Sequence, residues 1–279
     1  MNKKIRMIGF DLDGTILDSK KRLSKENIEA VTQAVEQGVI VLPATGRPQA
    51  GVPKEVLAIP GVRYLLASNG TRIIDLTTDE VIYQMCMDHE LTMRLARSFA
   101  QVTDGMWELY AEGKCFVNEE TYHFVDHPAM TAEMIQYLSS TRTYVKDLLG
   151  NMEATKACAE KFQTFYENEE RLERTMEILD REPEVVVTSS SPYNLEINSK
   201  KAGKGNGLLA LGKILGIEKE EIMAIGDSSN DWDMLEKVGM PVVMENSDAK
   251  TKKLAKYIAR SNDENGVAHV IRKFILEKE

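Results

Sequence analysis

The sequence predicts an α/β protein in which a parallel-sheet core is interrupted by an inserted α+β domain. Short apolar runs of strand length alternate with amphipathic helical segments at both ends of the chain, as in sheets built from strand–helix–strand units. The middle of the chain replaces this alternation with hairpin-like and mixed segments. Four of the apolar runs end in polar turns, where the carboxyl ends of parallel strands bind ligands.

The length and composition fit this architecture. The chain has 279 residues, of which 43% are hydrophobic and 28% charged, so it can build two ordinary globular domains. Its net charge of -9 argues against a general binder of nucleic acid or of anionic membranes. The first apolar run is interrupted at Asp11, too early for a signal peptide or a membrane span, and the three cysteines form no CxxC pair. We therefore expect a cytoplasmic protein.

The N-terminal part of the core is predicted to contain three strands. Residues 5–10 form a near-continuous apolar run, as expected for a strand that is buried on both faces of a parallel sheet. A helix follows over about residues 24–37, with Ser24 as its cap and Gly38 at its end. Residues 39–42 and 64–67 are the second and third strands of the parallel sheet.

The inserted domain begins after a predicted hairpin over residues 72–83. Mixed helices and strands with antiparallel signals then continue to about residue 198, which indicates a separate α+β module. We place the core at residues 1–83 and 198–279 and the inserted domain at residues 84–197. Within the inserted domain we expect helices near residues 90–102, 130–139 and 169–181, and strands near 107–111, 114–117, 162–166, 185–188 and 195–197.

The parallel pattern returns in the C-terminal part of the chain. The expected elements, in order, are a helix over residues 205–215, a strand over 222–226, a helix over 231–238, a strand over 241–244 and a terminal helix near 265–276.

Two carboxylates follow the first strand. Asp11 and Asp13 are two residues apart, so in an extended segment their side chains point to the same side, and Gly14 permits a sharp bend after them. Holding two carboxylates together is costly unless a cation or a proton shares the site. We interpret the pair as a divalent-metal site in which Asp11 attacks phosphorus. The alternative is a strand that ends in an ordinary acidic turn.

The polar turns after the other strands are expected to join this site. Three aspartates from two strand ends suit Mg²⁺, which prefers a few carboxylates, waters and phosphate oxygens. Thr45 offers a hydroxyl to a phosphoryl oxygen, although it could instead cap a helix. The ammonium of Lys204 and the helix N-terminus beside it would both favour an anion. The turns contain Thr45 and Arg47, then Ser68 and Asn69, then Asp227, Asn230 and Asp231.

These residues resemble the four motifs of the haloacid dehalogenase-like superfamily. Their order and spacing are similar to the Cof-type branch, whose members are mostly phosphatases of sugar phosphates or related small molecules. The resemblance implies a Rossmann-like core and an inserted cap domain that determines substrate specificity. The matching segments are Asp11-Leu12-Asp13-Gly14-Thr15, Thr45-Gly46-Arg47, Lys204-Gly205 and Gly226-Asp227-Ser228-Ser229-Asn230-Asp231.

The resemblance also implies a role for each residue. Asp11 would be the nucleophile that forms an aspartyl-phosphate, and Asp13 the general acid and then base. Mg²⁺ would be held by Asp11, by the carbonyl of Asp13 and by Asp227. The phosphoryl group would be bound by Thr45, Gly46, Lys204 and Asn230, with Arg47, Asn69 and Asp231 in the surrounding shell or at the substrate.

The predicted function is therefore a Mg²⁺-dependent phosphatase of small phosphorylated metabolites, with no nucleic-acid or membrane partner. A phosphotransferase or phosphomutase that uses the same intermediate is one alternative. A phospho-acceptor signalling or binding protein is another, since receiver domains also combine an acidic Mg²⁺ pocket with a hydroxyl residue and a lysine. The sequence does not predict an oligomeric state.

Overall fold

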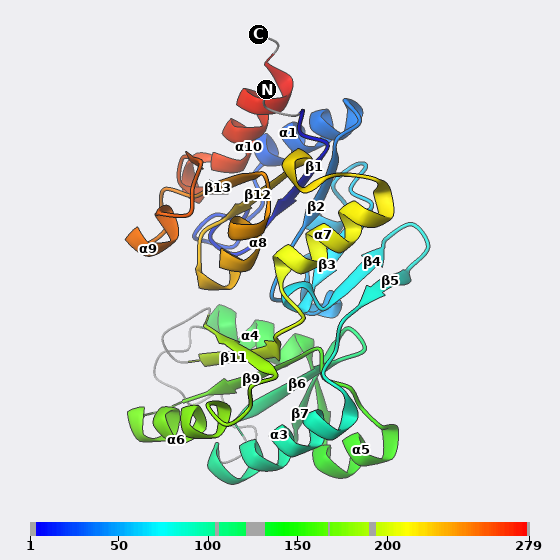
Figure 1. Ribbon diagram of the computed structural model, residues 1–279, viewed down its shortest axis with the longest axis vertical. Coiled ribbons are helices and arrows are strands. Elements are labelled where there is room, and N and C mark those ends of the chain that lie inside the picture. The colour runs from blue at the N-terminus through cyan, green and yellow to red at the C-terminus, as the bar shows by residue number, and fades with distance from the viewer. Residues whose placement is uncertain (1–3, 104–105, 121–131, 167, 190–193, 278–279) are drawn as a thin grey trace. The chain divides into compact units, whose positions relative to one another are not determined.

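The computed structural model describes residues 4–103, 106–120, 132–166, 168–189 and 194–277, and the α/β fold class is confirmed (Figure 1). The chain forms two compact units. We call Met1–Arg47, Val52–Gln84 and Ala202–Glu279 the core unit, and Pro48–Gly51 with Met85–Lys201 the inserted unit. None of the described helices is long and apolar enough to cross a membrane.

A five-stranded parallel sheet forms the centre of the core unit. Its strand order is β14-β13-β12-β1-β2, so the first strand of the chain lies beside one that comes more than 200 residues later. Every residue of β1 and β12 is buried, as the apolar runs predict. The strands are β1 (Met7–Phe10), β2 (Ile40–Pro43), β12 (Ile222–Gly226), β13 (Met240–Val243) and β14 (Tyr257–Ile258).

Helices cover both faces of this sheet (Figure 1). Val31 of α1 and Val267 of α10 pack with Ile8 and Phe10 on one face, in a cluster of fully buried apolar side chains. On the other face, α7 and α8 bury leucines and methionines against the sheet. The core helices are α1 (Lys25–Glu36), α2 (Lys54–Leu57), α7 (Lys204–Leu215), α8 (Trp232–Lys237), α9 (Ala249–Lys252) and α10 (Gly266–Ile271), which continues as a π-helical turn over Arg272–Leu276.

The third predicted strand differs from the expectation. Tyr64–Ala67 (β3) has one parallel bridge to the core sheet, between Ala44 and Leu66. Backbone hydrogen bonds between the turns that follow β2 and β3 extend this contact, such as the one from Ser68 N–H to the carbonyl of Arg47 at 2.9 Å. The regular partner of β3 is β4 (Arg72–Asp75), which pairs with it antiparallel, and β5 (Glu80–Gln84) completes a separate three-stranded sheet. The physical reason is the turn after β3, where Ser68 and Asn69 have positive φ and reverse the chain at once.

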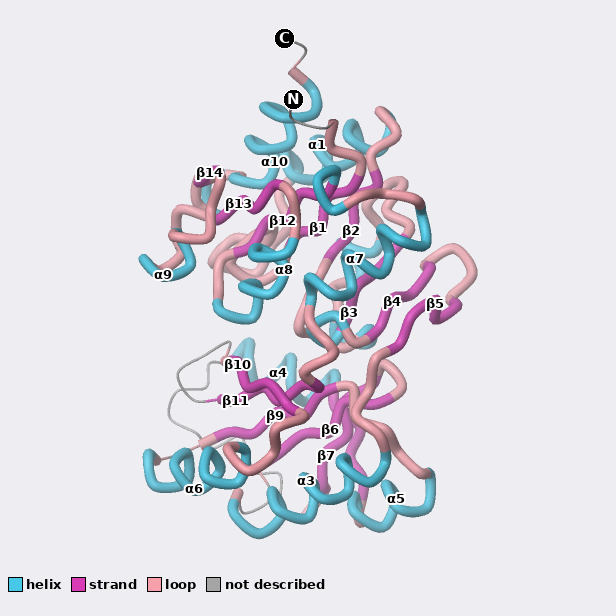
Figure 2. The backbone as a smooth tube through the Cα atoms, in the orientation of Figure 1, coloured by secondary structure: helices cyan, strands magenta, loops and turns pink. Residues whose placement is uncertain are grey.

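A six-stranded sheet of order β10-β11-β9-β6-β7-β8 forms the inserted unit (Figure 2). The predicted elements are present, although the residues near Met130, where one helix was expected to begin, lie outside the described part. The structure adds β8 and α5, which the sequence did not predict. The elements are α3 (His89–Val102), β6 (Trp107–Ala111), β7 (Lys114–Asn118), α4 (Ala132–Thr141), β8 (Arg142–Val145), α5 (Leu148–Thr155), β9 (Lys161–Phe165), α6 (Glu169–Leu179), β10 (Val185–Thr188) and β11 (Asn194–Ser199).

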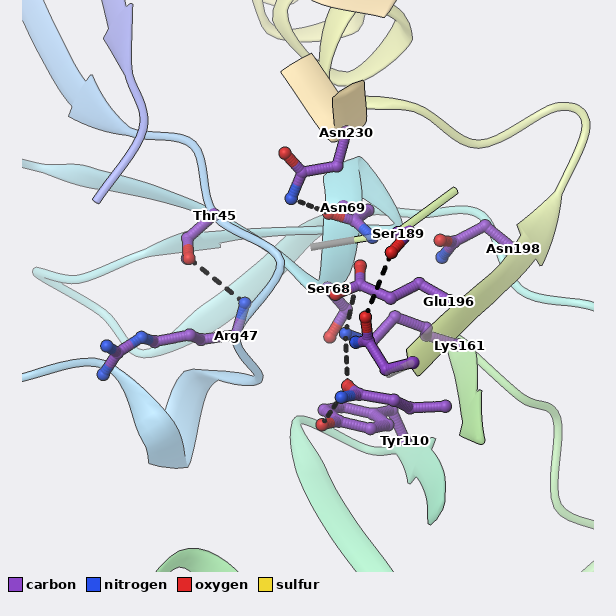
Figure 3. Close-up of polar contacts among 12 residues, drawn as sticks. Thr45, Arg47, Ser68, Asn69, Tyr110, Lys161, Ser189, Glu196, Asn198 and Asn230 are labelled. Atoms are coloured by element: carbon purple, nitrogen blue, oxygen red, sulfur yellow. Dashed lines mark hydrogen bonds and ion pairs between the residues drawn. The ribbon is translucent and has the colours of Figure 1, made fainter. Parts of the chain in front are cut away.

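The two faces of the inserted sheet differ in chemistry. Helices α3, α5 and α6 lie along one face (Figure 2). The apolar side chains of that face pack against them. The other carries buried charges in pairs, with Arg142 bonded to Glu108 at 2.8 Å and the Lys161 ammonium 3.5 Å from Glu196. Figure 3 shows Lys161 beside Glu196 and over the ring of Tyr110. Each of these two positive side chains therefore has a negative partner.

Candidate active site

The carboxyl ends of β1 and β12 bring three aspartates together. The two strands are parallel neighbours, and Asp11 continues their ladder by donating its N–H to the carbonyl of Ile225 at 2.9 Å. Asp227 follows β12 directly, and Asp231 ends the 3₁₀ turn Ser229–Asp231 as the N-cap residue of α8. Asp11, Asp227 and Asp231 each offer a carboxylate oxygen, and these oxygens lie within 4.8 Å of one another.

Gly14 makes the approach of Asp227 possible. Its φ of 81° is in the region that favours glycine, and a Cβ at this position would collide with the Asp227 carboxylate. Thr15 then donates its hydroxyl to Asp227 Oδ1 at 2.9 Å. The carbonyl of Gly14 accepts a hydrogen bond from Asn246 at 2.9 Å, which fixes the turn from the other side.

Lys204 neutralises part of this acidic group. Its ammonium is fully buried and lies 2.6 Å from Asp11 Oδ1 and 2.6 Å from Asp231 Oδ1. Burial alone would lower the pKa of Lys204, but the two carboxylates outweigh it and raise the pKa. The second oxygen of Asp231 accepts the N–H groups of Asp227 and Ser228 at 2.8 and 3.1 Å. Asp231 therefore orients both the lysine and the turn that carries Asp227.

One ammonium is not enough to ionise the whole group. Burial raises the pKa of Asp11 well above its usual value of 3.8, and the charges of Asp231 and Asp227 raise it further against the opposing effect of Lys204. Burial and the neighbouring Asp231 likewise raise the pKa of Asp227 to about 7. A divalent cation would reverse both shifts, since it favours the charged carboxylates. The donor set of clustered carboxylate oxygens therefore fits a hard divalent cation.

The carboxylate of Asp13 lies outside the acidic group, although the sequence placed it beside Asp11. It accepts two hydrogen bonds from the guanidinium of Arg47, at 2.8 and 2.7 Å, and one from Lys21 at 2.8 Å. Burial would raise the pKa of Asp13, but these two cations lower it to about 2. The two carboxylates of the first motif consequently have opposite electrostatics, with Asp11 favouring its proton and Asp13 its charge.

Several residues expected around the phosphoryl group follow the carboxyl ends of β2, β3 and β12; Figure 3 labels Thr45, Arg47, Asn69 and Asn230. The buried hydroxyl of Thr45 accepts the N–H of Arg47 at 3.1 Å, so the turn containing Gly46 wraps around it. Asn230 donates to Asn69 at 3.5 Å and accepts the hydroxyl of Ser228 at 2.8 Å. The structure thus connects the second and fourth motifs through the turn that follows β3.

The helix N-terminus beside Lys204 differs from the expectation. The amides of Gly205 and Asn206, which the sequence offered to an anion, donate instead to the carboxylate of Asp233 at 2.8 and 3.1 Å. A phosphate would meet a like charge at those amides. Of the groups that the sequence offered to an anion at this helix, the ammonium of Lys204 is the one that the carboxylate of Asp233 does not occupy.

Three residues of the site were not predicted from the sequence. Thr15 belongs to the first motif, and its position in the turn after Asp13 could have predicted that its hydroxyl lies at the site. Lys21 bonds Asp13 from a turn in which Lys21 itself has a φ of 60°. No pattern in the sequence predicts that turn. Asp233 resembles any acidic residue on a helix, and only the packing of α8 against α7 shows its contact.

A sheet of this order with this site at its carboxyl edge defines a haloacid dehalogenase-like hydrolase. The chain matches the family described by that name over residues 8–271, and it belongs to that family. The resemblance of the motifs to this superfamily and its Cof-type branch is thereby confirmed.

Relatives specify the class of enzyme. The chain is 31% identical to the 5-amino-6-(5-phospho-D-ribitylamino)uracil phosphatase YwtE of Bacillus subtilis strain 168, over 96% of this chain and 97% of that one. It is 28% identical to the phosphatase YwpJ of the same organism, over 96% and 99% of the two chains. A solved haloacid dehalogenase-like hydrolase from B. subtilis superposes with a TM-score of 0.83 at 28% identity, over 96% of this chain and 99% of that one. The protein is a phosphatase.

Proposed function

We propose that the protein is a Mg²⁺-dependent hydrolase of small phosphomonoesters that works through an aspartyl-phosphate at Asp11. The observation that carries this proposal is the buried Asp11 carboxylate, which has Lys204 at 2.6 Å and Asp227 within the same acidic group. A carboxylate so placed is fixed for attack on a phosphoryl group whose charge the ammonium offsets. The family match and the phosphatase relatives support the same chemistry.

The proposed reaction has two steps at one phosphorus atom. In the first step, an oxygen of Asp11 forms a bond to phosphorus while the bond to the leaving oxygen breaks, and Asp13 gives its proton to that oxygen. In the second step, Asp13 takes a proton from a water molecule, whose oxygen attacks phosphorus and releases Asp11 and inorganic phosphate. Lys204 and Thr45 bind the phosphoryl oxygens throughout.

A bound Mg²⁺ would supply positive charge to the phosphoryl oxygens and keep the carboxylates ionised. Asp11 and Asp227 are the proposed carboxylate ligands, together with the backbone carbonyl of Asp13. Asp231 has both oxygens committed, one to Lys204 and the other to two backbone amides. Its proposed role is to orient the lysine and the metal-binding turn.

The contacts of Asp13 affect its proposed role as the acid in the first step of the reaction. With Arg47 and Lys21 bonded to its carboxylate, Asp13 is ionised at neutral pH, which suits the base but not the acid. Protonation of Asp13 therefore requires it to separate from these cations before the leaving oxygen departs. Arg47 belongs to the turn that holds Thr45, so a phosphoryl group bound there would compete for the same guanidinium.

We also propose that the inserted unit selects the substrate, over about residues 84–197, and that the substrate is a sugar phosphate or a related metabolite. The polar face of its sheet carries the carboxylate of Glu196, beside Lys161, and two amides. Gln163 accepts the hydroxyl of Tyr110, and Asn198 donates to the carbonyl of Glu160. The charges on that face are paired, which favours a neutral hydroxylated body over a second anionic group. A cytoplasmic location stays a prediction from the sequence.

The deciding experiment follows phosphate release from a panel of phosphorylated metabolites with Mg²⁺. Wild type should release phosphate without any added acceptor, EDTA should stop the reaction, and Mg²⁺ should restore it. Asp11→Asn should abolish turnover while leaving the protein folded, which a cooperative thermal unfolding transition would show. Asp18→Asn, a half-buried carboxylate on the same segment that bonds Arg22 and lies outside the acidic group, is the matched control and should remain active. Near-normal turnover by Asp11→Asn would exclude Asp11 as the nucleophile. A strict need for an acceptor hydroxyl would indicate a phosphotransferase.

A further inference from the structure

Helix α7 has Lys204 as its first residue, and its own N-cap supplies no side chain. The N-cap is Gly203, and no side chain of that segment bonds the first turn. The first amides of a helix nevertheless need acceptors. Here the amides of Gly205 and Asn206 donate to Asp233 Oδ2 at 2.8 and 3.1 Å. Because Asp233 belongs to α8, the helix that carries Lys204 is capped by a neighbouring helix.

This contact is closely fitted. A Cβ at Gly203 would collide with the Asp233 carboxylate, and a Cβ at Gly205 would collide with the Asp233 carbonyl. Gly203 also has a φ of 149°, which residues with a side chain rarely adopt. On the far side, Lys237 donates to Asp233 Oδ1 and, at 2.6 Å, to Asn206 Oδ1. The carboxylate is therefore held from both sides and cannot rotate away without losing several bonds.

The same segment also holds the other end of the Lys204 side chain. Asp231 and Asp233 stand on either side of Trp232 at the start of α8. Asp231 Oδ1 lies 2.6 Å from the Lys204 ammonium, while Asp233 binds the helical turn from which that side chain leaves. We infer that Asp233 is a positioning residue, which fixes the backbone of Lys204 so that its ammonium reaches Asp11. The effect on turnover rests on the function proposed above.

The expected effect of removing Asp233 is on kcat. Displacing a charge by about 1 Å in an active site can cost on the order of 100-fold in rate, so Asp233→Ala should lower kcat by roughly 10- to 100-fold. KM should change less than kcat, because the ammonium also binds the substrate but offsets more negative charge in the transition state. Asp233→Asn retains an oxygen acceptor for the two amides and should recover part of the loss.

A double-mutant cycle distinguishes positioning from general destabilisation. Asp233→Ala is measured with Mg²⁺ and p-nitrophenyl phosphate in wild type and in a Lys204→Gln background. If Asp233 acts through Lys204, its removal should cost less than about 3-fold in that background. An equal loss in both backgrounds would overturn the inference. Glu236→Gln, an exposed carboxylate on the same helix, is the control and should leave kcat unchanged.

A second measurement needs no activity. In a crystal structure of Asp233→Ala, the Lys204 nitrogen should no longer lie within hydrogen-bond distance of both Asp11 and Asp231. Retention of both contacts would overturn the inference whatever the kinetics show. If Lys204→Gln itself turns over like wild type, the role proposed for Lys204 in catalysis fails, and the crystal structure still decides whether Asp233 positions it.

Discussion

The raised pKa of Asp227 allows a test of the metal site that needs no substrate. In the metal-free protein, burial and the charge of Asp231 raise the pKa of Asp227 from 3.8 to about 7. Between these values the folded protein binds a proton that the unfolded chain does not. The free energy of unfolding must therefore fall as pH rises from about 4 to about 7, and no further above that. Asp227→Asn has no such group and should lack this loss.

The magnitude follows from the width of that window. Each pKa unit is worth about 1.4 kcal/mol. Between pH 5 and pH 8, the free energy of unfolding of wild type should therefore fall by about 3 kcal/mol more than that of Asp227→Asn. This figure is an upper bound, because water reaches the partly exposed carboxylate. The charge of Asp227 also helps to raise the pKa of Asp11, so Asp11 has a lower pKa in the variant. The stability of the variant should depend less on pH for this reason too.

Urea unfolding in EDTA at pH 5 and pH 8 measures this difference. A Trp107→Phe background leaves Trp232 of the core unit as the only tryptophan of the chain. The exposed Asp180→Asn is the control and should follow wild type. Saturating Mg²⁺ should reverse the order at pH 8, because only wild type retains both proposed carboxylate ligands. Equal pH dependence of wild type and Asp227→Asn in EDTA would refute the electrostatic account of the site.

Three further substitutions have expected outcomes. Gly14→Ala should lower activity by roughly 100-fold or more, because its Cβ displaces Asp227; phosphate release at saturating Mg²⁺ measures it. Arg47→Gln should raise the pKa of Asp13, so the acid limb of the pH–kcat profile should move to higher pH. Glu108→Gln should destabilise the inserted unit by about 3–5 kcal/mol in urea, because it leaves a buried guanidinium without its counter-charge.

Each substitution has a matched control. Gly38→Ala has the same backbone strain, with a φ of 83° and no atom near its Cβ, so it should cost about 1 kcal/mol of stability and no activity. Arg63→Gln breaks a comparable pair with Asp75 and should leave the pH profile in place. Glu170→Gln removes an exposed pair and should cost under about 0.5 kcal/mol. If a control variant showed the same loss or shift as the variant it is paired with, the physical reason given for that variant would be wrong.

Elements with strong periodicity or long apolar runs could be predicted from the sequence. The apolar runs at both ends of the chain predict a parallel core, and parallel strands bring their carboxyl ends to one edge of the sheet. This rule predicts that the turns of Asp11 and Asp227 lie at the same edge, and the observed order of the strands makes them neighbours. The rule depends on the direction of the strands and not on how far apart the two residues are in the sequence.

Features set by single turns or by packing could not be predicted. Helix α5 has Gly150 and Asn151 in its middle, and it depends on capping by Asp147 and on burial of Met152. The contact of Lys21 depends on one residue with positive φ. The antiparallel pairing of β3 likewise depends on local backbone geometry, which hydrophobic periodicity does not report.

The order of strands in the core sheet also governs when the enzyme becomes active during synthesis. β1 hydrogen-bonds to β2 and to β12, and Thr15 meets a carboxylate 212 residues later in the chain. At about 5–20 residues per second, a ribosome needs roughly 10–40 seconds to make that stretch. The inserted unit is contiguous in sequence except for Pro48–Gly51, and so it emerges whole within that interval. A nascent chain shorter than 204 residues lacks both Lys204 and Asp227, so the proposed mechanism predicts that it has no phosphatase activity.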